Sequence, residues 1–366
     1  MPQDIAYFHS ILKSELDLTQ KYIKTFSESK DKLANKAIRH VVNNKGKMLR
    51  PIFLILAGKY SYKISNEDEK NEIFFTEDIA KAAAILELIQ MSSLAHDDVL
   101  DHSTNRRNKS TLNSLRGNRF AILMGDYLVV QSLRHCYQLV HHAVRIFDSD
   151  IMLSFLESIS KLILGEIQQN NFNENVESKE DGIKSYIEIV ENKTASLFSL
   201  ACSVGSKIGS NNVEHDEILK QFGHHIGIAY QIIDDLRDFS LSKEISGEKN
   251  FQDMKFGIKT LPIIFANRFS HNGEQEKLSK SFNCKKEIPE NDKLEIIEIL
   301  EKSGSIQNCF GEAKTHIAKA RIILYELPKN EYSVLLEELV SYISHIGEAV
   351  VDNIISSVRA SPPAIA

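Results

Sequence analysis

Helical periodicity runs through almost the whole chain and limits the folds open to it. Residues 335–358, LLEELVSYISHIGEAVVDNIISSV, place apolar side chains three and four positions apart, as in an amphipathic helix. Similar patterns cover 4–26, 49–62, 77–101, 118–140, 149–170, 182–208, 213–240, 259–269, 291–303 and 306–326. Alternating runs typical of strands are nearly absent. We therefore predict an all-α protein of ten or more helices.

The polar segments between these helices indicate connections, because no Pro/Gly/Ser-rich spacer interrupts the chain. We expect a single helical domain over residues 1–366. The chain has 42% hydrophobic and 26% charged residues, as a globular protein does. Its net charge of −6 argues against nucleic-acid binding driven by bulk charge. No apolar run reaches about 18 residues, so we expect no membrane span.

The N-terminus and the cysteines bear on the compartment. The start, MPQDIAYFHS, has an early Asp and no long apolar stretch, unlike a secretory signal. The four cysteines show no C-x-x-C spacing and are interpreted as reduced thiols. We expect a cytoplasmic protein, with an organelle such as the mitochondrion as the alternative.

Two strongly apolar helices end in aspartates. Residues 78–101 are apolar or small on nearly every face, as in a buried central helix, and residues 222–239 repeat the design. The two clusters comprise Asp97, Asp98 and Asp101, and Asp234, Asp235 and Asp238. The first and third members of each cluster are four apart and share one helix face. Negative charge at a helix C-terminus costs stability unless cations bind there, and oxygen ligands suit Mg²⁺.

Basic side chains accompany both acidic clusters. They are Lys47, Arg50, Arg106, Arg107 and Lys193. Arginine binds phosphate oxygens through two N–H groups, and lysine acts as a point charge. Together with the aspartates they indicate a diphosphate held through metal on one side and by basic residues on the other. The apolar helices would wall a deep central cavity for a long hydrocarbon tail.

These stretches resemble the trans-isoprenyl diphosphate synthases, also called the polyprenyl synthetase family. The matching pieces run in family order from residue 46 to residue 262: GKMLRP, ELIQMSSLAHDDVLDHSTNRRNKST, GDYL, GEIQQ, KTA, FGHHIGIAYQIIDDLRDF and GIKTLP. The resemblance implies a helical homodimer in which two or three Mg²⁺ per site support condensation of isopentenyl diphosphate with an allylic diphosphate. The expected product is a polyprenyl diphosphate of about 20 carbons or more, for quinone side chains or related isoprenoids. The resemblance also favours a peripheral membrane contact for product release.

The resemblance assigns roles to individual residues. All six aspartates would hold Mg²⁺, and the catalytic set would be Asp97, Asp98, Asp101, Lys193, Asp234 and Asp235. The implied contacts to the allylic diphosphate are Arg106, Lys193, Thr194 and Gln231. The implied contacts to isopentenyl diphosphate are Lys47, Arg50, Gln90 and Arg107. Lys249 and Lys259 stand one position away from the family's lysines and are assigned as phosphate ligands that close over the site.

Small side chains near the first cluster bear on product length. Ser93 and Ser92 precede Asp97 by four and five residues, which is about 6–7.5 Å along a helix. Ser93 lies about 40° from the Asp97 direction and Ser92 about 140° from it. Family members with bulky aromatic residues at these positions stop chain growth early, so two serines leave the shaft open down to Ile89. The alternative is that the serines only permit close helix packing.

Two other functions compete with a prenyl synthase. A non-catalytic subunit of a heteromeric synthase would explain the displaced lysines, although both aspartate clusters are intact. A metal phosphohydrolase would use the His96–Asp97 pair, but such sites need several further histidine ligands. A class I terpene cyclase would share the first DDxxD, but its second metal motif normally mixes Asn, Ser or Thr with Glu.

Overall fold

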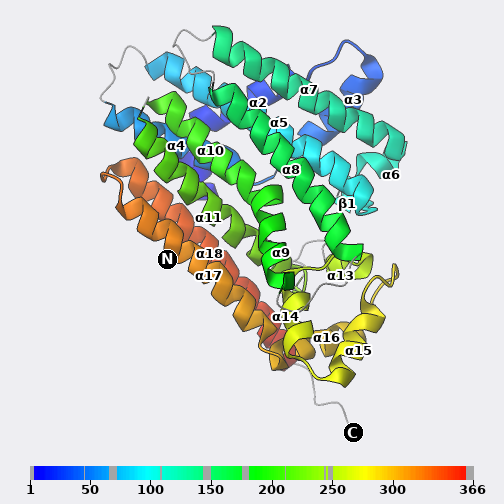
Figure 1. Cartoon of the computed structure of the whole chain (residues 1–366). Coiled ribbons are helices and arrows are strands. Elements are labelled where there is room, and N and C mark those ends of the chain that lie inside the picture. Colours follow the sequence, from blue (N-terminus) through cyan, green and yellow to red (C-terminus); the bar gives the residue numbers. More distant parts are fainter. Residues whose placement is uncertain are drawn as a thin grey trace. The chain divides into compact units, whose positions relative to one another are not determined.

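The computed structural model describes residues 4–44, 46–65, 72–107, 109–142, 150–174, 181–210, 212–242, 245 and 250–359. Apart from one antiparallel hairpin of β1 (Asn105–Arg106) and β2 (Lys109–Ser110), the elements of this described part are helices (Figure 1). The predicted all-α class is confirmed. The sequence patterns at 4–26 and 182–208 each correspond to more than one helical element.

The chain forms two compact units. Unit 1 comprises Met1–Lys161, Ser196–His224 and Ala320–Tyr342. Unit 2 comprises Leu162–Ala195, His225–Lys319 and Ile343–Ala366. The single domain expected over residues 1–366 stays a prediction.

Unit 1 contains most of the N-terminal helices. They are α1 (Ile5–Ile11), α2 (Lys13–Ser27), α3 (Lys32–Val42), α4 (Leu49–Ile64), α5 (Glu72–Leu100), α6 (Leu112–Arg116), α7 (Asn118–His142) and α10 (Ser196–Gly209). Unit 2 contains α9 (Asp181–Val190), the π-helix η2 (Glu191–Ala195), α13 (Gln252–Phe256), α14 (Leu261–Phe269), α15 (Asn272–Ser281) and α16 (Glu290–Lys302). Four helices have residues in both units: α8 (Asp150–Glu174), α11 (Val213–Arg237), α17 (Ser305–Tyr325) and α18 (Glu331–Arg359).

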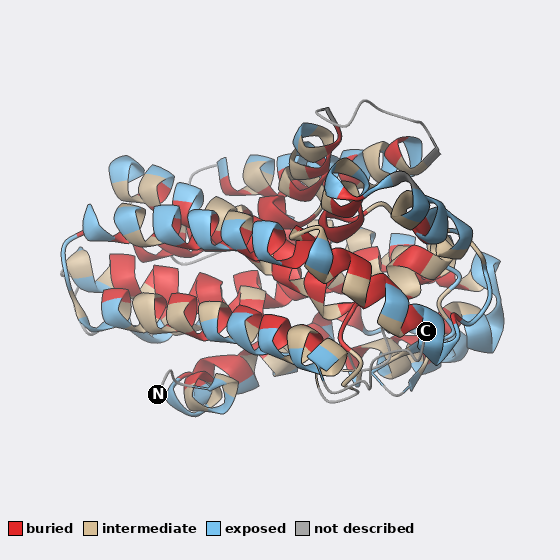
Figure 2. Ribbon diagram, turned by 90° about the horizontal axis from the view of Figure 1, so that it is seen from below, coloured by how far each residue is buried: buried red, intermediate tan, exposed pale blue. Residues whose placement is uncertain are grey.

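Helix α5 is the central element of unit 1. It packs against α2, α4, α7 and α10, and every residue from Ala82 to Ile89 is buried. Helix α10 lies closely on α4, where a Cβ at Gly205 would come within 2.2 Å of the Leu54 carbonyl oxygen. Only glycine permits that approach. The buried central helix predicted from residues 78–101 is therefore confirmed, and Figure 2 shows buried residues on the inner faces of the helices.

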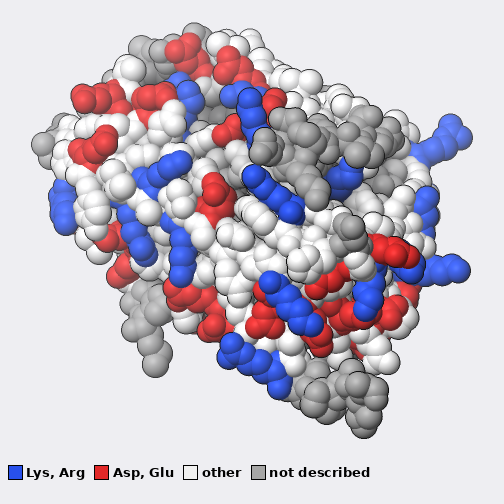
Figure 3. Space-filling view, turned by 60° about the horizontal axis from the view of Figure 1, so that its bottom comes forward, with Lys and Arg blue, Asp and Glu red and all other residues white. Residues whose placement is uncertain are grey.

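The described surface matches the composition. Acidic and basic side chains are interspersed on the face drawn in Figure 3, without a continuous basic stripe among the residues described there. In the described parts of the chain, no helix combines the length and apolarity needed to cross a membrane. All four cysteines are free, and Cys136, Cys202 and Cys309 are buried.

Candidate active site

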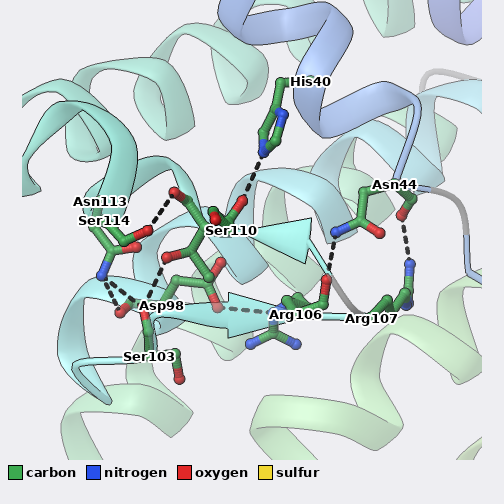
Figure 4. Close-up of polar contacts among 10 residues, drawn as sticks. His40, Asn44, Asp98, Ser103, Arg106, Arg107, Ser110, Asn113 and Ser114 are labelled. Atoms are coloured by element: carbon green, nitrogen blue, oxygen red, sulfur yellow. Dashed lines mark hydrogen bonds and ion pairs between the residues drawn. The ribbon is translucent and has the colours of Figure 1, made fainter. Parts of the chain in front are cut away.

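The first aspartate cluster closes helix α5. Asp97 and Asp98 lie in its last turn, and Asp101 follows directly. Asp98 is buried, and its Oδ1 accepts a hydrogen bond from Arg106 Nε at 2.7 Å (Figure 4). Burial raises the pKa of the Asp98 carboxyl, and the Arg106 guanidinium opposes that rise. The Oδ1 of Asp97 is buried without a hydrogen-bond partner, so this oxygen is suited to accept a cation.

The hairpin of β1 and β2 carries the paired arginines. Arg106 turns toward Asp98, whereas Arg107 turns toward Asn44 after α3 (Figure 4). Arg107 has a φ of 54°, in the left-handed region. Asn113 on α6 supports the start of this segment, because its Nδ2 donates to the carbonyl oxygen of Asp98 at 2.8 Å. The two neighbouring arginines thus contact different parts of unit 1: Arg106 pairs with Asp98, and Arg107 donates to the backbone of Asn44.

The predicted ligands of isopentenyl diphosphate also lie in unit 1. Lys47 is exposed before α4, and its Nζ lies 3.4 Å from the Tyr342 hydroxyl. Arg50 lies in the first turn of α4, with its guanidinium carbon 4.6 Å from the centroid of the Phe198 ring. Gln90 is half-buried on α5.

Glu87 lies three residues before Gln90 and is buried on the same helix. Burial raises the pKa of its carboxyl, and the positive charges of Arg50 and Arg107 counteract that rise. Glu87 thus interacts electrostatically with two of the predicted phosphate ligands, which the sequence reasoning did not foresee. The signal in the sequence is that Glu87 is the one polar residue between Ala82 and Ile89.

The second aspartate cluster closes helix α11 in unit 2. Asp234 Oδ1 pairs with Arg237 Nη1 at 2.7 Å. Asp235 is buried, and its oxygens accept hydrogen bonds from Gln231 Nε2 at 2.7 Å and from the Tyr186 hydroxyl at 2.6 Å. Burial, aided by the negative charge of Asp253, raises the pKa of Asp235 to about 7. The sequence analysis did not foresee Tyr186, which lies 49 residues away along the chain.

The third aspartate of this cluster has a structural task. Asp238 is fully buried, and its two oxygens accept the backbone N–H groups of Gln252 at 2.9 Å and Asp253 at 3.2 Å. These are donors of the first turn of α13, which has no side-chain cap from its own N-cap residue, Phe251. Asp238 therefore fixes α13 to the end of α11, beside any part it has in metal binding.

Lys193 and Thr194 lie in the π-helix η2. The wider turn brings their backbone close to α8, where a Cβ on Gly165 would meet Lys193 N at 2.6 Å. Lys193 Nζ pairs with Glu166 at 2.9 Å, and the Thr194 hydroxyl donates to Gln231 Oε1 at 2.7 Å. A continuous network thus runs from Thr194 through Gln231 and Asp235 to Tyr186.

The two displaced lysines have different outcomes. Lys259 Nζ donates to the Phe172 carbonyl oxygen at 2.7 Å and lies 5.4 Å from the centroid of the same residue's ring. Its assignment as a phosphate ligand stays a prediction. Lys249 lies outside the described residues.

The predicted site residues are divided between the two units, and hydrogen bonds join Asp98 to Arg106 and Gln231 to both Thr194 and Asp235. Unit 1 holds the first aspartate cluster with Lys47, Arg50, Gln90, Arg106 and Arg107, and unit 2 holds the second cluster with Lys193, Thr194, Gln231 and Lys259. Among the residues that the structure describes, no three His, Cys, Asp or Glu side chains already converge on a metal position. Asp98 and Asp234 instead pair with arginines. The donor chemistry nevertheless fits a hard cation, because every donor is a carboxylate and Asp97 offers a buried, unpartnered oxygen.

Comparison with known proteins identifies the family. The polyprenyl synthetase model matches residues 31–300, which include both aspartate clusters and every predicted site residue. The chain belongs to the polyprenyl synthetase family. It is thus a trans-prenyltransferase of the polyprenyl diphosphate synthase type, and the resemblance of its motifs to this family is confirmed.

Relatives of this family match nearly the whole chain. Heptaprenyl diphosphate synthase component 2 of Bacillus subtilis (strain 168) is 28% identical over 336 residues, 92% of this chain and 89% of that protein. The geranyl-diphosphate-specific all-trans-nonaprenyl-diphosphate synthase of Rhodobacter capsulatus is 30% identical over 321 residues, 87% of this chain and 91% of that protein. The crystal structure of a decaprenyl diphosphate synthase from Rhodobacter capsulatus is similar with a TM-score of 0.79, at 25% identity over 93% of this chain and 98% of that one.

Proposed function

We propose that this chain condenses isopentenyl diphosphate with an allylic diphosphate to build a polyprenyl diphosphate of about 20 carbons or more. The observation that carries the proposal is the pair of aspartate clusters, each at the end of a buried helix with basic residues beside it. The relatives named above, whose names specify hepta-, nona- and decaprenyl products, support a long product.

Magnesium fits the carboxylates of both clusters. The residues that would hold it are Asp97, Asp98 and Asp101 in unit 1 and Asp234, Asp235 and Asp238 in unit 2. Bound Mg²⁺ would neutralise negative charge on the departing diphosphate. Asp98 and Asp234 each pair with an arginine through Oδ1, so the second oxygen of each carboxylate could bind the cation while the pair persists.

The basic residues of the chain promote ionisation of the allylic substrate. Arg106 and Lys193 donate to the oxygens of the allylic diphosphate as the C–O bond breaks, and so stabilise the charge that develops there. Thr194 and Gln231 contact the same diphosphate, and their mutual hydrogen bond fixes both side chains. The apolar helices exclude water from the allylic cation, which would otherwise be hydrolysed.

Carbon–carbon bond formation follows on the second substrate. Lys47, Arg50, Gln90 and Arg107 hold isopentenyl diphosphate so that its double bond attacks the allylic cation. The new cation then loses a proton to the released diphosphate. Loss of this proton forms the allylic double bond of the lengthened product. Each round adds one five-carbon unit and releases one diphosphate.

A partner subunit without activity of its own is the second candidate. The observation that favours it is the similarity to a protein named component 2 of a heptaprenyl synthase. Condensation by the purified chain alone would decide between the two candidates. The homodimer, the membrane contact and the cytoplasmic location stay predictions.

Substitution of one aspartate in each cluster tests the proposal. Asp97→Ala and Asp234→Ala should each lower kcat on the order of 10³-fold or more, because each removes a ligand of the metal-held leaving group. Asp17→Ala, at an exposed position on α2, is the matched control and should retain wild-type turnover. The assay measures diphosphate release that depends on isopentenyl diphosphate. Wild-type turnover in either cluster variant at saturating Mg²⁺ would contradict the proposal, and release without isopentenyl diphosphate would indicate a phosphohydrolase.

A further inference from the structure

One residue after α3 contacts both paired arginines. The side-chain Nδ2 of Asn44 donates to the backbone carbonyl oxygen of Arg106 at 2.9 Å, and the backbone carbonyl oxygen of Asn44 accepts from Arg107 Nη1 at 2.7 Å (Figure 4). Asn44 is half-buried. It thus reaches the backbone of one arginine and the side chain of the next.

The hairpin that carries these arginines needs such an anchor. Its strands have only two residues each, and Arg107 adopts the left-handed conformation that L-residues disfavour. Two more contacts from the end of α3 hold it: Lys109 Nζ donates to the Asn43 carbonyl oxygen at 2.9 Å, and His40 Nε2 lies 2.6 Å from the Ser110 carbonyl oxygen. The end of α3 therefore sets where the hairpin lies.

Gly46 completes the seat of the Arg107 side chain. A Cβ at this position would lie 2.5 Å from Nη2 and 2.9 Å from Cζ of Arg107. The guanidinium therefore rests on the backbone immediately before Lys47, another predicted ligand of isopentenyl diphosphate. Gly46 has no positive φ, so a Cβ here would act by displacing the Arg107 guanidinium rather than by straining the backbone.

We propose that Asn44 is a positioning residue that aligns Arg106 with the allylic diphosphate and Arg107 with isopentenyl diphosphate, while Gly46 seats Arg107 alone. The inference rests on the proposed function, because the two arginines are assigned to two substrates there. Neither Asn44 nor Gly46 needs to touch a substrate. Their effect passes through the hairpin and the Arg107 guanidinium.

The two positions predict different kinetic signatures. Asn44→Asp keeps the size of the side chain but replaces the N–H donor facing the Arg106 carbonyl with an oxygen. It should raise KM for both substrates about tenfold, with kcat within about twofold of the wild type. Gly46→Ala should raise KM for isopentenyl diphosphate by a similar factor and leave KM for the allylic substrate unchanged. Asn43→Ala is the control, because Asn43 meets the hairpin through its backbone carbonyl, and it should match the wild type.

A direct titration separates failure of the inference from failure of the proposed function. Isopentenyl diphosphate, added calorimetrically without an allylic substrate, should bind about tenfold more weakly to Asn44→Asp and Gly46→Ala than to the wild type and Asn43→Ala. Wild-type protein that binds isopentenyl diphosphate but does not condense it would overturn the proposed function. The positioning role would still be supported if both variants bind that substrate more weakly than the wild type. Unchanged KM and unchanged binding in both variants would overturn the positioning role of Asn44 and Gly46. So would a fall in kcat and Tm at unchanged KM in both, since that result indicates only a folding role.

Discussion

At the scale of single residues, burial raises the pKa of a carboxyl group outside the candidate site. Asp216 on α11 is buried, and its Oδ1 has no hydrogen-bond partner. Burial raises its pKa from 3.8 to about 6, although Ser206 and Lys207 oppose the rise. The native state therefore binds more protons than the unfolded state between these two values. The free energy of unfolding should fall as pH rises through this window and should not recover above it on account of this group.

Asp216→Asn should remove that pH dependence. Because a shift of about two pKa units corresponds to about 2–3 kcal/mol, the variant should be more stable than the wild type at pH 8 by up to that amount and similar at low pH. Urea unfolding across the pH range measures the difference. Glu214→Gln, at an exposed position in the same helix, should follow the wild-type curve. Parallel curves for Asp216→Asn and the wild type would contradict the assignment.

The basic residues allow a test of the division between two diphosphates. Lys47→Ala and Arg107→Ala should raise KM chiefly for isopentenyl diphosphate, because each removes a positive charge from that substrate's phosphates. Arg106→Ala and Lys193→Ala should mainly impair use of the allylic substrate. Steady-state kinetics with one substrate varied at a time distinguishes the groups, with exposed Lys161→Ala as the control. Equal weakening of both substrates in all four variants would refute the division.

At the scale of elements, regular periodicity predicted helices well and local irregularities poorly. The nearly continuous apolar face of residues 78–101 identified the buried helix α5. The pattern at 182–208 predicted one helix, yet five of its residues form the π-helix η2. The apolar spacing did not reveal this turn, because a single π-helical turn changes few side-chain positions. The capping of α13 by Asp238 joins residues 14 and 15 positions apart and carries no periodic signal.

In the candidate site too, the sequence predicted some residues and missed others. The DDxxD spacing and the resemblance predicted the aspartates and the basic side chains. They did not predict Tyr186, Glu87 or Asn44, because a hydrogen bond or an electrostatic interaction between distant positions depends on tertiary packing. Such supporting residues become visible only when the helices are placed in space.

We expect different effects from substitution of the two serines of α5. Ser92 donates to the Gly125 carbonyl oxygen on α7 at 2.9 Å, as expected of a packing residue. Ser92→Phe should therefore strain the α5–α7 contact and lower the free energy of unfolding by about 1–3 kcal/mol. Position 93 faces closer to the Asp97 direction. Ser93→Phe should therefore shorten the main product by blocking the predicted shaft above Ile89.

Product analysis and denaturant unfolding of the two single variants measure these effects. The double variant should show both of them. An unchanged long product in Ser93→Phe would remove this residue from chain-length control. A shortened product in Ser92→Phe without loss of stability would reverse the roles of the two serines.

At the scale of the whole molecule, each compact unit supplies part of the proposed machinery. Unit 1 carries one aspartate cluster and the predicted ligands of isopentenyl diphosphate, whereas unit 2 carries the other cluster and Lys193. Neither unit holds all the residues that the proposed reaction needs. We therefore expect a substitution in either aspartate cluster to abolish the same activity.

Incubation of the purified chain with farnesyl diphosphate, excess isopentenyl diphosphate and Mg²⁺ tests the central claim most directly. Chain-length analysis of the products should show polyprenyl diphosphates of about 20 carbons or more, because the small side chain of Ser93 is expected to leave the predicted shaft open past the primer. Omission of Mg²⁺ should abolish the products. Failure to elongate the 15-carbon primer, with Mg²⁺ present and the protein folded, would contradict the account.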